Sequence, residues 1–149
     1  MKNKFLNKIY LIIILILFSF TANAEENKNI NEHQINAFVG NFDFSDNKQK
    51  AILVGFQHQN ENLERDTFLG NISPITGGFL TENSAAYIYT GVEWNYAIGD
   101  KLKFTPSFAP GIYHQGNGKD LGHALEFKTE VQASYSVSGS TSIGMSYNH

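Results

Sequence analysis

The sequence predicts an all-β protein, an antiparallel β-barrel, and three observations favour this fold class. Segments of about 7 to 15 residues recur in which apolar and polar side chains alternate, as in half-buried strands. Turn-forming stretches such as Gly99-Asp100 and Ser138-Gly139-Ser140 separate these segments. From residue 25 onward, no segment sustains the apolar spacing of an amphipathic helix.

The chain begins with the pattern of a secretory signal peptide. Lys2, Lys4 and Lys8 precede an apolar run over residues 9–20, and Ala22-Asn23-Ala24 then forms an A-x-A cleavage site. The apolar run has about 12 residues, whereas a spanning helix needs about 20, which favours a cleaved signal over a retained anchor. We expect residues 1–24 to be the signal peptide, residues 25–33 a flexible leader, and residues 34–149 the barrel domain.

Composition excludes several classes of function. Without the three leader lysines, 8 basic and 14 acidic residues remain, which gives a net charge of −6. No basic stripe is available to neutralise phosphates, so we expect no nucleic-acid partner. The chain contains no cysteine, so hydrogen bonding and packing must hold the fold without disulfides. The length after the leader suits one domain.

Seven segments have strand character, and together they predict an antiparallel meander with the first and last segments at its two ends. The clearest is 123–137, where apolar residues such as Leu125 and Phe127 alternate with charged ones. The weakest is 66–80, which Pro74 and Gly77 interrupt. The faces of 34–44 cannot be assigned, because its apolar residues have both parities. The segments are 34–44, 51–57, 66–80, 86–96, 102–113, 123–137 and 141–149.

Alternation alone fits both a soluble barrel with apolar residues inside and a membrane barrel with apolar residues facing lipid. Strands long enough to cross a bilayer, and small or charged residues on the minor face, favour the membrane barrel. A third feature is a set of aromatic residues, which form either interfacial girdles or part of a β-core. These residues are Tyr87, Tyr89, Trp94, Tyr96, Tyr113, Tyr135 and Tyr147.

Two groups of residues are candidates for chemistry. Glu126, Lys128 and Glu130 share the minor face of one strand, and we interpret them as an ion network in the lumen rather than a catalytic carboxylate pair. The histidines have no metal-ligand spacing, so we expect no metal site and no cofactor. They are His33, His58, His114, His123 and His149. His149 has the parity of the apolar face, an unfavourable place for an imidazole unless it lies at the membrane rim or has a function.

Several segments closely resemble successive segments of the lipid A deacylase family, also labelled acyloxyacyl hydrolase or lipid A 3-O-deacylase. The likeness covers roughly residues 71–149, about half of the chain, and the order and spacing of the segments agree. The segments are Phe104-Thr105-Pro106-Ser107-Phe108-Ala109-Pro110-Gly111-Ile112-Tyr113, Gly116-Asn117-Gly118-Lys119-Asp120-Leu121-Gly122, Leu125-Glu126-Phe127-Lys128 and Ile143-Gly144-Met145-Ser146-Tyr147-Asn148-His149.

The resemblance implies an eight-stranded outer-membrane barrel with a catalytic His-x-Ser-Asn motif and a later Glu. His149 matches the first position of that motif and is the expected catalytic residue; the given sequence ends before the other positions. Seven segments are also one short of the even number used by closed bacterial barrels. We therefore expect a fragment without its closing strand and without the Ser nucleophile, inactive as it stands.

By this resemblance, the expected function is hydrolysis of an ester-linked acyl chain of lipid A in the outer membrane of a Gram-negative bacterium. The expected partners are lipopolysaccharide and membrane lipid. Two alternatives stay open: a non-enzymatic outer-membrane barrel, and a soluble periplasmic barrel that binds an apolar ligand.

Overall fold

The computed structural model describes residues 33–43 and 50–149, and the expected signal peptide lies outside the described residues, as does the leader up to residue 32. Each of the seven expected segments forms a strand. A 3-10 helix, η1 (Glu61–Leu63), follows the second segment. The third expected segment, 66–80, is divided: it begins in a short strand, β3 (Arg65–Thr67), and continues from residue 70 in a long one. The long strands are β1 (His33–Phe42), β2 (Ala51–Asn60), β4 (Gly70–Thr81), β5 (Ala86–Ile98), β6 (Leu102–His114), β7 (Leu125–Ser138) and β8 (Thr141–Asn148).

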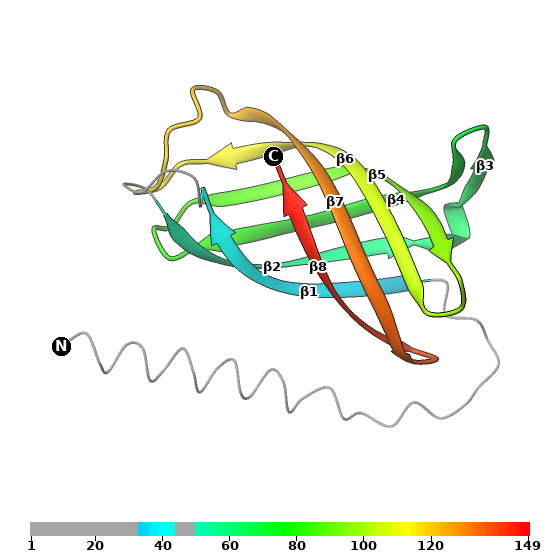
Figure 1. Cartoon of the computed structure of the whole chain (residues 1–149). Coiled ribbons are helices and arrows are strands. Elements are labelled where there is room, and N and C mark those ends of the chain that lie inside the picture. The colour runs from blue at the N-terminus through cyan, green and yellow to red at the C-terminus, as the bar shows by residue number, and fades with distance from the viewer. Residues whose placement is uncertain (1–32, 44–49) are drawn as a thin grey trace. The chain divides into compact units, whose positions relative to one another are not determined.

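All strands belong to one antiparallel sheet in the order β1-β2-β4-β5-β6-β7-β8, with β3 paired to β4. The predicted meander is therefore confirmed, with β1 and β8 as its two ends. Figure 1 shows the sheet curling so that β7 and β8 come round in front of β1 and β2. The Asn36 side chain of β1 donates a hydrogen bond to Gln132 of β7 at 3.3 Å, so the curl brings these strands together across the interior. Among the described residues, β1 and β8 do not pair with each other, and the sheet is an open barrel.

Strand β4 is the element for which the sequence was least informative. It is twelve residues long and lies within the sheet rather than at an edge. One side of β4 pairs with β2 at residues 75–81 and with β3 at residues 70–72, and Pro74 lies in the gap between these pairings. Proline has no N–H to donate, so it disrupts the hydrogen-bond ladder least where the strand has no partner on that side. A Cβ on Gly77 would lie 2.7 Å from the Tyr89 hydroxyl oxygen, so glycine leaves space for that ring.

The two faces of the sheet differ in polarity. On β7, Leu125, Phe127 and Val131 point outward and are 44 to 57% exposed, whereas Lys128 points inward and is 7% exposed. On β1, whose faces the sequence left unassigned, Ile35 points outward. The sheet therefore has an apolar outer face and a largely polar inner face, with the charged residues of β7 directed inward as expected. Among the described residues, no helix is long and apolar enough to cross a lipid bilayer.

One part of the interior is aromatic. Phe79 packs against Phe42 and Tyr87, with ring centroids 5.8 and 5.5 Å apart, and Tyr87 stacks on Tyr89 at 5.5 Å. Tyr113 stacks on Phe42 at 6.1 Å. The girdle interpretation is therefore wrong for Tyr87, Tyr89 and Tyr113, which are buried core residues. Burial of their rings stabilises the interior, and the tyrosine hydroxyls find hydrogen-bond partners there.

Candidate functional site

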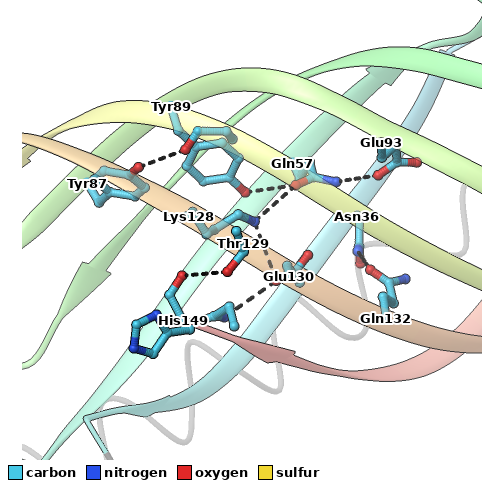
Figure 2. A network of polar contacts seen from close by, with 12 residues as sticks. Asn36, Gln57, Tyr87, Tyr89, Glu93, Lys128, Thr129, Glu130, Gln132 and His149 are labelled. Carbon is cyan, nitrogen blue, oxygen red and sulfur yellow. Dashed lines mark hydrogen bonds and ion pairs between the residues drawn. The ribbon is translucent and has the colours of Figure 1, made fainter.

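A connected polar network fills the interior beside the aromatic residues (Figure 2). At its centre is Gln57 of β2, which accepts hydrogen bonds from the Tyr89 hydroxyl at 2.9 Å and from Lys128 Nζ at 3.4 Å. The amide nitrogen of Gln57 donates to Glu93 Oε2 at 2.9 Å. All four side chains are largely buried, and each is satisfied by another member of the network. A buried network of this kind stiffens the structure that contains it.

Lys128 joins this network to a second carboxylate. Its Nζ lies 3.4 Å from Glu130 Oε2 and 4.2 Å from the centre of the Tyr89 ring, within the range of a cation–π contact. Asn148 of β8 also donates to Glu130, at 3.4 Å. Glu126 shares this inward face, where the Tyr87 hydroxyl donates to its backbone carbonyl. The interpretation as an ion network in the lumen is confirmed for Lys128 and Glu130.

The polar part of the interior leaves little free space. A cavity of about 20 Å³ is bounded by amide, hydroxyl and charged side chains, a volume that fits water molecules. Pockets that hold small-molecule substrates are larger by an order of magnitude, about 300 Å³ or more. The cavity is therefore too small for a lipid or its acyl chain. Its lining residues include Gln34, Asn36, Gln57, Gln59, Glu93 and Lys103.

His149 lies on the outer wall, as its parity predicts. Its backbone N–H and C=O exchange hydrogen bonds with Thr129 of β7, both at 2.8 Å, so the β7–β8 ladder extends one residue past β8. The Thr129 hydroxyl also donates to the His149 carbonyl at 3.2 Å, as Figure 2 shows. Because Thr129 belongs to the outward face of β7, the imidazole of His149 lies on the apolar side of the sheet.

The surroundings of His149 are apolar and come from three strands. Phe108 of β6 is the cross-strand partner of Thr129, and Tyr147 of β8 is the partner of Val131. Phe108 and Phe127 stack with ring centroids 5.9 Å apart. The row Phe108–Thr129–His149 thus runs across the outer face between exposed apolar side chains.

Neither serine of β8 shares the face of His149. Ser142 pairs with Ser136, and Ser146 pairs with Gln132, and both partners belong to the inward face of β7. Among the residues that the structure describes, the hydroxyl nearest to His149 in the ladder is that of Thr129, and it is bonded to a backbone carbonyl. The described part of the chain therefore places no serine side chain on the same face as the His149 imidazole.

Two of the other histidines contact each other. His33 and His58 are 25 positions apart in sequence but meet on the outer face of β1 and β2, with His33 Nδ1 3.0 Å from His58 Nε2. Sequence spacing contained no signal for this pair, because the contact arises from the β1–β2 register. Over residues 33–43 and 50–149, no group of three or more His, Cys, Asp or Glu side chains is arranged to hold a metal ion.

These features define a class of protein: an antiparallel barrel with an apolar outer wall, an interior filled with polar and aromatic side chains, and a histidine on the outer wall. No protein-family model, curated protein or solved structure matches the chain. The likeness to the lipid A deacylase family therefore rests on the sequence segments alone.

Proposed function

We propose that this chain is part of an outer-membrane esterase that hydrolyses an ester-linked acyl chain of lipid A. The observation that carries the proposal is the position of His149 on the apolar outer wall. An esterase whose substrate is already dissolved in the bilayer needs its catalytic groups on the lipid-facing surface. The resemblance of roughly residues 71–149 to the lipid A deacylase family supports the same activity.

A bilayer accounts for the apolar outer face. Every long strand exposes two or more large hydrophobic side chains, apart from β4, which exposes only Leu80. Contiguous apolar surface on this scale is rare on soluble monomers and is what lipid-facing barrels display. Examples are Ile35, Val39, Val54, Phe56, Ile88, Phe108, Ile112, Phe127, Val131, Ile143 and Met145.

In the proposed reaction, His149 removes the proton from a serine hydroxyl as the oxygen attacks the ester carbonyl, and it later protonates the leaving alcohol. The resemblance implies that this serine follows two positions after the histidine, on the same face of the strand. A later glutamate would orient the imidazole. The polar network behind β7 supports the wall on which these groups lie, because Glu130 is bonded to both Lys128 and Asn148.

The test compares three polypeptides in cells whose lipid A is analysed by mass spectrometry: residues 1–149, the chain extended through the codons downstream of His149, and the extended chain with His149→Ala. We expect only the unaltered extended chain to remove an acyl group. Loss of a catalytic base slows such reactions by about 10²–10⁴-fold or more. His123→Ala in the extended chain is the matched control and should leave activity unchanged.

Two results would contradict the proposal. Acyl release by the His149→Ala form would remove His149 from the mechanism. A downstream reading frame with no serine two codons after His149 would favour the second candidate, a non-enzymatic outer-membrane barrel. That candidate has its own support in the interior cavity, which is too small for a lipid.

A further inference from the structure

Two histidines meet on the outer face of the sheet, where β1 begins and β2 ends. His33 Nδ1 lies 3.0 Å from His58 Nε2, and the ring centroids are 5.1 Å apart with the planes inclined by 24°. The centroid separation is close to the N···N distance plus one ring radius for each imidazole, which is the value expected when the two nitrogens lie between the two ring centres. The rings therefore meet edge to edge, with their nitrogens directed toward each other, and both lie at an exposed site.

We propose that His33 and His58 form a two-histidine site for a divalent transition-metal ion, zinc or copper, with water as the other ligands. Zinc–imidazole bonds are about 2.0–2.1 Å long, so two histidines on a tetrahedral ion have their nitrogens about 3.3 Å apart and their ring centroids about 5.2 Å apart. The pair is within a few tenths of an ångström of both values. To bind one ion, the two rings turn so that both nitrogens point at the ion rather than at each other.

The sheet holds the two ligands in place before an ion binds. His58 is the cross-strand partner of Ile35, so His33 is its diagonal neighbour on the same face. Diagonal neighbours in an antiparallel pair are within reach of long side chains. The polar cross-strand partners of the two histidines are already hydrogen-bonded: Asn60, opposite His33, accepts from the Asn62 N–H, and Thr76, opposite His58, is bonded to Thr90. Water is therefore the expected source of the remaining ligands, because the pair lies where β1 begins and β2 ends, at the rim where a membrane-embedded barrel meets water.

The chemistry of the donors selects the class of ion. Neutral imidazole nitrogens suit zinc, copper and nickel, and affinity along the first-row series is greatest for Cu²⁺. Hard ions such as Mg²⁺ and Ca²⁺ prefer oxygen ligands and are not expected here. In the absence of metal, a single shared proton accounts for the short N···N distance, and a bound ion replaces that proton. This site is separate from His149 and does not depend on the proposed esterase activity.

The experiment uses the untagged chain in detergent micelles and titrates it with Zn²⁺ and with Cu²⁺. We expect one ion per chain by calorimetry, and a copper electron paramagnetic resonance spectrum that shows coupling to two nitrogens. His33→Ala and His58→Ala should each weaken binding by at least about tenfold, since loss of a mere supporting contact to a metal ligand costs 10–100-fold. Both variants should reduce the copper coupling to one nitrogen, and His123→Ala should change neither measurement.

The copper spectrum of the unaltered chain tests the site without any substitution. Coupling to fewer than two nitrogens, or no binding of either ion at concentrations on the order of 1 mM, would overturn the proposal. Equal affinity in the parent and in both alanine variants would do so as well. His33→Gln repeats the test with a side chain of similar size, and circular dichroism verifies that each variant keeps its strand content.

Discussion

Lys128 links three other side chains of the interior network. Its ammonium group is bonded to Gln57 and Glu130 and lies over the Tyr89 ring. The cation is buried, and so is the carboxylate that it pairs with. A buried pair of this kind adds little stability relative to an apolar replacement of both partners, but removal of one partner leaves a charge without compensation.

We therefore expect Lys128→Met to destabilise the barrel by about 3–5 kcal/mol in urea unfolding from detergent or lipid, because Glu130 stays buried without its cation. The double substitution Lys128→Met with Glu130→Gln should recover much of that loss. Lys101→Met, in an exposed turn, is the matched control and should have an effect of less than about 1 kcal/mol. Unchanged stability of the Lys128→Met variant would show that the interior is wet enough to solvate Glu130.

At the scale of single elements, β6 shows how a strand inside the sheet accommodates proline. Pro106 and Pro110 both point outward. The β5–β6 pairing is interrupted opposite each proline, whereas the β6–β7 pairing runs through both. The side of β6 that lacks two N–H groups therefore faces β5, where the ladder is already broken. Near Pro110, a Cβ on Gly91 would lie 2.5 Å from the Cα of Ala109, so glycine allows the two strands to approach closely.

Strand β7 allows a test of membrane embedding within one element. Val131 lies near its middle and Val137 near its end, and both are exposed on the outer face. In a bilayer, Val131→Lys should cost about 2–4 kcal/mol of unfolding free energy and Val137→Lys about 0–1 kcal/mol, because the cost of a charge depends on its depth. Unfolding in lipid vesicles measures both values. Equal and negligible costs would show that this face contacts water.

At the scale of the whole sheet, the polarity of the two faces predicts where the protein is found in the cell. A barrel with an apolar outer wall should stay in the membrane fraction through washes with high salt and enter solution only with detergent. Fractionation followed by immunodetection of the chain measures this directly. Recovery in a periplasmic wash without detergent would instead indicate a soluble barrel and would exclude the membrane-bound esterase.

Much of this architecture could be predicted from the sequence, because alternation in a strand has a period of two residues and is visible locally. The seven strands and the shared face of Leu125 and Phe127 follow from that period, whereas the outward direction of this face was inferred from strand length and from the small and charged residues opposite. The same parity placed His149 on the outer wall. Tyr87 and Tyr89 also had inward parity, and the girdle interpretation was wrong because it weighed residue type above parity.

The tertiary structure alone decided which residues of different strands meet. Pro74 and Gly77 are strand breakers by local rules, yet β4 is continuous, since β2 and β3 share its edge and Tyr89 occupies the space above Gly77. The Gln57–Glu93 bond and the His33–His58 contact join positions 36 and 25 residues apart. Such contacts depend on register and on the curl of the sheet, which are set by all strands together and leave no periodic trace in any one of them.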